Sequence, residues 1–173
     1  MRMMNKILSD LIDFEKAFPE YVFHKVCARS YFTERSTVQN YKFLSEVLSR
    51  AEPGACLNVL FIVVADDGHE VVAKNNFSRN QLGGIWSELS DSHDRLVLHG
   101  GCGRVIVFPD NEAWAIYEEV LEENGVLVVF NDCALSDIGL MEDDFVSRDL
   151  LVARAIEGVL RVDYIEKLIT NYA

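Results

Sequence analysis

The chain has 173 residues, half of them apolar, and its 28 acidic and 16 basic side chains give a formal net charge of -12. A chain of this length buries roughly 70% of the surface that its unfolded form exposes, so a hydrophobic core can stabilise it without disulfides or a structural metal. Intrinsic disorder is excluded as the dominant state. The negative charge disfavours direct binding to nucleic acid or to an anionic membrane surface, because both would repel it.

The first residues lack the apolar stretch and small-residue cleavage site of a secretion signal, so we expect a cytoplasmic protein. The longest apolar run, near Leu57 to Ala65, is far shorter than the ~20 residues that a membrane-spanning helix needs. The four cysteines are scattered along the chain in or beside apolar segments. Such residues behave as small hydrophobic side chains, which predicts free thiols.

Residues 4–18 place apolar side chains at helical spacing and charged ones on the other face, which predicts an amphipathic helix ended by Pro19. The aromatic segment 21–32 is compatible with a helix or with a strand. Ser36 or Thr37 is a suitable cap for a second helix. The apolar face of that helix contains Val38, Tyr41, Leu44, Val47 and Leu48.

Leu57 to Ala65 is rich in β-branched residues and has the length of a strand buried on both faces. The turn signal of residues 66–68 and the segment from His69 to Lys74 complete a predicted hairpin. A short helix is expected over residues 82–90, although two glycines weaken it.

A strand from Val105 to Phe108, a helix from Glu112 to Asn124 and a strand from Val126 to Phe130 form a predicted parallel βαβ unit. Two helices follow, over residues 146–160 and 163–172. The predicted fold class is therefore α/β, or α+β. It is expected as a single globular domain over residues 1–173, with a mixed sheet, one parallel βαβ unit, and N- and C-terminal helices packed on the sheet.

The negative charge is concentrated in one segment of 43 residues. Residues 105–147 contain 11 acidic side chains and no Lys or Arg, whereas the other 130 residues carry 17 acidic and 16 basic side chains. Two explanations are open: a solvated face that tolerates the charge, or a surface that meets a cationic partner. The candidate partner-binding residues are Asp110, Glu112, Glu118, Glu119, Glu122, Glu123, Asp137, Glu142, Asp143 and Asp144.

Asp66, Asp67, Asp110 and Asp132 each follow a predicted strand. In a parallel sheet these positions share one edge, where carboxylates can hold Mg²⁺ for phosphoryl chemistry. The structural explanation is that two belong to a hairpin turn, one to a helix cap and one to a loop. A small metal-dependent α/β enzyme that uses these residues is the alternative to a binding protein.

Two His-x-x-Cys pairs provide a second possible metal site. His24 with Cys27 and His99 with Cys102 would complete a tetrahedral zinc site if the fold brought them together. Packed thiols and surface or capped histidines explain the same residues without a metal. The sequence does not decide whether the two pairs meet in space.

Cys102 and Cys133 are possible thiol nucleophiles, but neither stands in a recognised signature with a His base. The glycine-rich segment 100–103 precedes a strand, whereas phosphate-binding glycine loops open a helix. No cofactor is therefore expected.

The first hypothesis is a non-enzymatic acidic protein that binds a basic protein partner. In general layout the chain resembles bacterial immunity proteins, such as those of contact-dependent growth inhibition systems, which are small, acidic, cytoplasmic proteins without an active site. The likeness covers size, charge and the run from Asp110 to Asp144, and it transfers no residue by position. It implies tight binding to a cognate toxin domain, commonly a basic nuclease. A third hypothesis is an adaptor whose aromatic segment, Phe18 to Phe32, makes an oligomer contact; the oligomeric state itself is not predicted.

Overall fold

The computed structural model describes residues 10–16, 18–34, 36–65, 68–98, 103–120, 124–130 and 134–172. The strands are β1 (Arg29–Thr33), β2 (Cys56–Ala65), β3 (Gly68–Ser78), β4 (Gly103–Pro109), β5 (Trp114–Glu119) and β6 (Asn124–Val129). The α-helices are α2 (Tyr41–Arg50), α3 (Leu82–Leu98), α4 (Arg148–Ile156) and α5 (Val162–Tyr172). Short 3₁₀ helices are η1 (Thr37–Gln39), η2 (Arg79–Gln81), η3 (Leu135–Ile138) and η4 (Glu142–Asp144).

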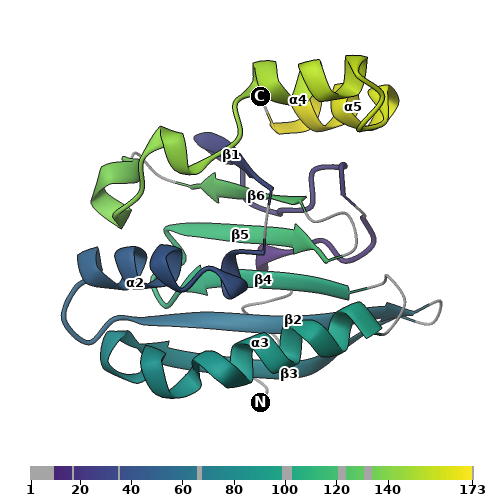
Figure 1. Cartoon of the computed structure of the whole chain (residues 1–173). Helices are drawn as coiled ribbons and strands as arrows, with labels where there is room; N and C mark the ends of the chain where they lie inside the picture. Colours follow the sequence, from purple (N-terminus) through teal and green to yellow (C-terminus); the bar gives the residue numbers. More distant parts are fainter. Residues whose placement is uncertain are drawn as a thin grey trace.

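The described strands form one sheet in the order β1-β6-β5-β4-β2-β3 (Figure 1). Each neighbouring pair of these strands is antiparallel. The predicted mixed sheet with a parallel βαβ unit is therefore wrong, and the fold is α+β. The segment expected to be a crossover helix over residues 112–124 instead contributes β5, which joins β4 and β6 in an antiparallel meander.

The sequence pattern of β5 misled the prediction because this strand is buried on both faces. Trp114 and Ile116 belong to the hydrophobic cluster on one side of the sheet, and Ala115 and Tyr117 to the cluster on the other. A strand covered on both sides shows a continuous apolar run rather than alternation. The apolar positions in 112–124 therefore matched helical spacing by coincidence.

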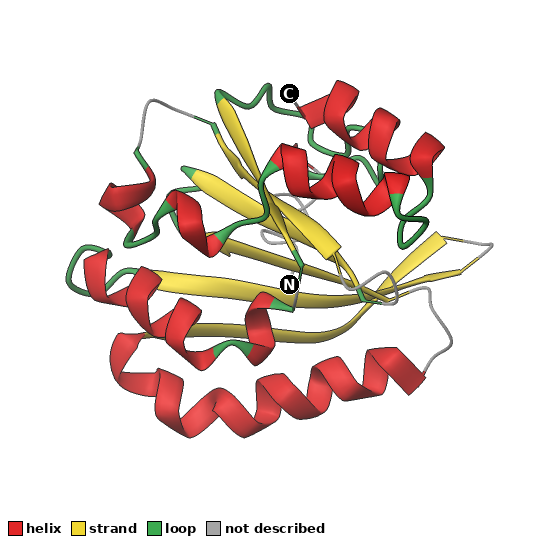
Figure 2. Cartoon of the chain, turned by 45° about the horizontal axis from the view of Figure 1, so that its top comes forward, coloured by secondary structure: helices red, strands yellow, loops and turns green. Residues whose placement is uncertain are grey.

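The first core cluster lies between the sheet and the α2 and α3 side of the molecule. Val59 and Phe61 of β2 pack there with Leu44 of α2 and with Leu89 and Leu96 of α3. All five side chains are at most 2% exposed. Figure 2 shows helices on both sides of the sheet.

The second core cluster covers the opposite face of the sheet. Leu60 and Ile62 of β2 belong to this cluster, as do Leu151 of α4 and Ile165 and Leu168 of α5, which lie beside β1 and β6. These positions alternate along β2 with those of the first cluster, as a pleated strand requires. Each face is thus closed by helices from a different part of the chain.

The aromatic N-terminal segment belongs to this second cluster. Phe18 and Phe23 are 5% and 3% exposed, and their rings lie 5.6 and 6.5 Å from the ring of Tyr172 in α5. The predicted helix over residues 4–18 does not reach its expected end, because Ile12 forms an antiparallel bridge with Phe23; residues 1–9 lie outside the described part. The aromatic rings proposed for an oligomer contact therefore fill the protein's own core.

Other predictions agree with the structure more closely. The hairpin of β2 and β3 is confirmed, and β3 is longer than expected. The helix expected over residues 82–90 continues to Leu98 as α3. In the described ranges, every helix is too short or too polar to cross a lipid bilayer.

Candidate functional site

A groove with a cavity volume of about 380 Å³ lies at the end of the sheet where α2 leads into β2 and β4 leads into β5. Its apolar lining includes Val47, Leu57, Trp114 and Ile138. Among the described residues that line it, Glu52, Asp110 and Asp137 are acidic and Arg50 alone is basic. We call this site the acidic groove.

Asp110 is held in place by two asparagine side chains. Asn58 of β2 is 5% exposed, and its Nδ2 donates to Asp110 Oδ1 at 2.9 Å. Asn76 of β3 donates to Asn58 Oδ1 at 2.9 Å and to Asp110 Oδ1 at 3.3 Å. The β-sheet therefore fixes the direction of an exposed carboxylate, which lowers the entropy cost of using it to bind a partner.

Several other predicted acidic residues stabilise local structure. Glu112 Oε2 lies 2.5 Å from Lys25 Nζ in an ion pair. Asp137 accepts a hydrogen bond from the backbone N–H of Ala134 at 2.9 Å, and Asp144 accepts one from Met141 at 2.8 Å. Both carboxylates are nevertheless exposed, together with those of Glu142 and Asp143 in η4.

Glu118 and Glu119 lie at the other end of β5 from the acidic groove. The six residues of β5 span roughly 20 Å, so the ten predicted partner-binding residues do not form one patch. Glu119 Oε1 is 3.9 Å from Arg104 Nε, and Glu118 is buried. Glu122, Glu123 and Asp132 lie outside the described residues.

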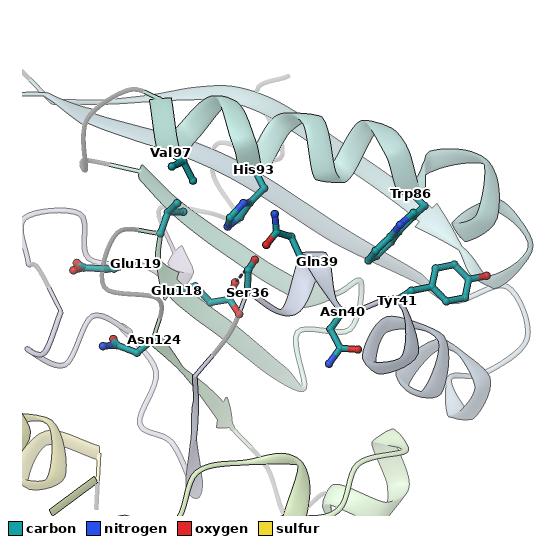
Figure 3. A pocket seen from close by; sticks show the side chains of 11 residues that line it. Ser36, Gln39, Asn40, Tyr41, Trp86, His93, Val97, Glu118, Glu119 and Asn124 are labelled. Atoms are coloured by element: carbon teal, nitrogen blue, oxygen red, sulfur yellow. Dashed lines mark hydrogen bonds between the residues drawn. The ribbon is translucent and has the colours of Figure 1, made fainter. Parts of the chain in front are cut away.

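Glu118 lines a second cavity, which we call the Glu118 cavity, with a volume of about 630 Å³. Its polar lining comes from η1, α3 and the adjoining ends of β5 and β6 (Figure 3). Glu118 Oε1 accepts a hydrogen bond from the Thr37 backbone N–H at 2.8 Å, and Oε2 accepts one from Ser36 Oγ at 3.3 Å. The side chains that line it include Ser36, Gln39, Tyr41, Trp86, His93 and Glu118.

Burial raises the pKa of the Glu118 carboxyl from its ordinary value of 4.5 to about 7, although the hydrogen bonds from Thr37 and Ser36 act in the opposite direction. The side chain is only 3% exposed, so the cost of removing its charge from water exceeds the stabilisation from these bonds. Glu118 therefore changes its charge near neutral pH.

The Glu118 cavity was not found from the sequence. If residues 114–119 had been identified as a strand, period-two alternation would have placed Glu118 on the same face as Trp114 and Ile116. A carboxylate on an apolar face is the signal that could have pointed to a buried ionisable group.

Gly125 of β6 leaves the space that the Glu118 side chain occupies. In the sheet it pairs with Glu118 on one side and with Thr33 on the other. A Cβ at this position would lie 2.5 Å from Tyr117 O, 2.7 Å from Glu118 Cγ and 2.8 Å from Thr33 Oγ1. The small residue is therefore required where strand backbone and buried carboxyl meet.

We predict that Gly125→Ala lowers the free energy of unfolding by about 2 kcal/mol or more, because all three close neighbours belong to the packed strands β1 and β5. Gly84→Ala on α3 is the matched control: no atom lies within 4 Å of its added Cβ, and alanine favours the helix by roughly 0.5–1 kcal/mol. Urea denaturation measures the free energy of unfolding of both variants. Equal stability of Gly125→Ala and the wild type would contradict the packing around Glu118.

The metal hypotheses gain no support from the described residues. Among them, no group of three or more His, Cys, Asp or Glu is placed to hold a metal ion. The predicted magnesium site requires that the carboxyl ends of the strands lie at the same end of the sheet. Because β2 and β4 are antiparallel, their carboxyl ends lie at opposite ends of the sheet. Asp66, Asp67 and Asp132 lie outside the described part.

The histidine and cysteine pairs are only partly visible. His24 is exposed and Cys27 is a half-buried free thiol. His99, Cys102 and Cys133 lie outside the described residues, so whether the two pairs meet stays open.

No family model, curated protein or solved structure matches this chain. The resemblance to immunity proteins therefore rests on size, charge and general layout. The function has to be inferred from the geometry of the two cavities and from the distribution of charge.

Proposed function

We propose that this protein binds a basic protein partner through the acidic groove, and that it is a cytoplasmic, non-enzymatic protein of the immunity type that neutralises a toxin domain. The observation that supports this proposal most directly is a groove with an apolar lining and three carboxylates, those of Glu52, Asp110 and Asp137. The exposed carboxylates of η4 follow Asp137 in the chain and extend the acidic character beyond the groove.

The two kinds of lining have separate roles in binding. Apolar pockets provide affinity when an anchor side chain of the partner becomes buried, and the apolar lining residues with exposed surface include Pro53, Ala55 and Ala113. Carboxylates around such a pocket speed the encounter with a positively charged protein and disfavour partners of the wrong charge. An anchor that combines an apolar stem with a positive end, such as an Arg side chain, satisfies both parts of the groove.

The proposed action on a toxin follows from the same charge. A nuclease binds nucleic acid mainly through Lys and Arg contacts with phosphates. A protein that places carboxylates against those side chains competes with the phosphates and blocks access to them. Glu118 takes no part in this contact, because it is buried at the other end of β5.

The test uses the full chain as bait in extract of its native cells. The groove variant is E52K/D137N, in which the amide that replaces the Asp137 carboxylate still has an oxygen that can accept from the Ala134 N–H. The control is E157K/E166Q, at exposed positions of the helical segment 148–172, which changes the net charge by the same amount.

We expect the wild type and the control to retain one basic protein that the groove variant does not. The captured protein is then identified, purified and assayed for nuclease or other toxic activity with equimolar wild type, which should inhibit it. A partner that is neutral or acidic, or that binds the groove variant as tightly as the control, would overturn the proposal.

A further inference from the structure

The Glu118 cavity is not used by the proposed function. It lies at the opposite end of β5 from the acidic groove and is larger, with about 630 Å³ against about 380 Å³. Its position between the sheet, η1 and α3 makes it separate from the proposed protein interface (Figure 3). The two sites can therefore be tested independently.

The cavity brings together a buried carboxyl, neutral hydrogen-bonding groups and two aromatic rings. Gln39, Asn40 and Asn124 provide side-chain amides, and the rings of Tyr41 and Trp86 meet edge to face at 5.2 Å. Figure 3 shows these rings at one end of the cavity and Glu118 further along it. A cavity of this kind suits an organic molecule with a polar end and an apolar body.

Charge restricts the ligand further. Glu118 and Glu119 line the cavity, and none of the described lining residues is Lys or Arg. An anionic ligand would meet the carboxylates of Glu118 and Glu119, which is unfavourable in a partly buried site. Arg104, which pairs with Glu119, is not among the described residues that line the cavity. The site therefore selects a positively charged ligand over an anionic one.

We propose that the Glu118 cavity binds a small organic cation, an amine or a guanidine, with the Glu118 carboxylate as its counter-ion. The carboxylate accepts two hydrogen bonds within the protein, from Thr37 and Ser36, and its two oxygens have capacity for about two more. A bound cation would compensate the desolvated charge, and Trp86 and Tyr41 offer ring faces or edges to its apolar part.

The ionisation of Glu118 makes this binding dependent on pH. Because its pKa is about 7 without a ligand, cation binding releases a proton below that pH and requires no proton release well above it. The other ionisable groups that line the cavity are His93 of α3, Glu119 of β5 and Tyr41 of α2. Arg104 of β4 lies 3.9 Å from Glu119, and Gln39 of η1 donates to Asp94 of α3 at 3.1 Å. A positive charge on His93 would also weaken the binding of a cation.

The probes are three isosteres that differ in charge: tyramine, its alcohol analogue tyrosol, and 4-hydroxyphenylacetate. Agmatine tests the guanidine group, and an acetylated arginine amide represents an arginine side chain of a protein. Titration calorimetry of the full-length protein should show tyramine or agmatine binding at least tenfold more tightly than tyrosol, with no binding of the anion. If the acetylated arginine amide binds and agmatine does not, the cation that the cavity recognises is an arginine side chain of a protein.

Glu118→Gln should weaken cation binding at least tenfold, and Glu166→Gln on the exposed face of α5 is the control that should not. For the wild type, affinity should fall about tenfold from pH 8 to pH 6, a measurement that needs no variant. In the His93→Gln variant the cation affinity should still decrease by most of this factor, because the ionisation of Glu118 causes the decrease.

The proposal is overturned if no cationic probe binds at millimolar concentration, if the three isosteres bind equally, or if Glu118→Gln binds as the wild type does.

Discussion

Replacing Glu118 with Gln is expected to remove a fall of about 3 kcal/mol in the stability of the protein between pH 4.5 and pH 8. In the wild type, the folded-state pKa of about 7 exceeds the ordinary value of 4.5, so the folded state holds its proton more tightly than the unfolded state does. The stability that this proton contributes is fully present below pH 4.5 and is lost as the pH rises through 7.

The variant tests this one group because glutamine preserves its local contacts. The amide oxygen can accept from the Thr37 N–H, and the amide nitrogen can donate to Ser36 Oγ. Urea denaturation of both proteins at a series of pH values gives the difference directly, with Glu166→Gln at an exposed position as the control. Parallel stability curves for the wild type and Glu118→Gln would show that Glu118 does not titrate near pH 7 in the folded protein.

Association with the basic partner is expected to slow at least tenfold in the groove variant E52K/D137N at low ionic strength. The variant removes two of the three carboxylates that line the groove and introduces a lysine there. Stopped-flow association at increasing salt measures the effect, because charges near the surface are screened beyond a Debye length of about 10 Å at 0.1 M salt. The wild-type rate should approach that of the variant as the salt rises.

The charge-matched control E157K/E166Q separates local from global effects. If net charge alone governed the encounter, this control would slow association as much as the groove variant does. A rate that is insensitive to salt for the wild type would equally contradict steering by the acidic groove.

The parts of the fold that sequence predicted well are those set by local signals. The β2–β3 hairpin has two strand-forming runs separated by a turn, and the helices α4 and α5 have apolar faces at helical spacing. The segment of β5 has no such signal, because Trp114, Ala115, Ile116 and Tyr117 are all buried. Their burial depends on α2 and α3 on one side and on the aromatic N-terminal segment and the C-terminal helices on the other, which is information from distant parts of the chain.

The candidate sites divide in the same way. Counting charge located Asp110 and Asp137, but it did not single out Glu52, which precedes the acidic segment and joins the groove only through the fold. Counting also treated Glu118 as a surface charge. Its buried position depends on the pairing of β5 with β6 and on the absence of a side chain at Gly125.

Amide hydrogen exchange of the complex with the purified basic partner tests the proposed interface most directly. Binding through the acidic groove should protect residues 47–57, 109–114 and 134–144, which contain the groove and its acidic extension, and leave the exchange of α4 and α5 unchanged. Protection confined to α4 and α5, with none at the groove, would contradict a function based on this acidic end of the sheet.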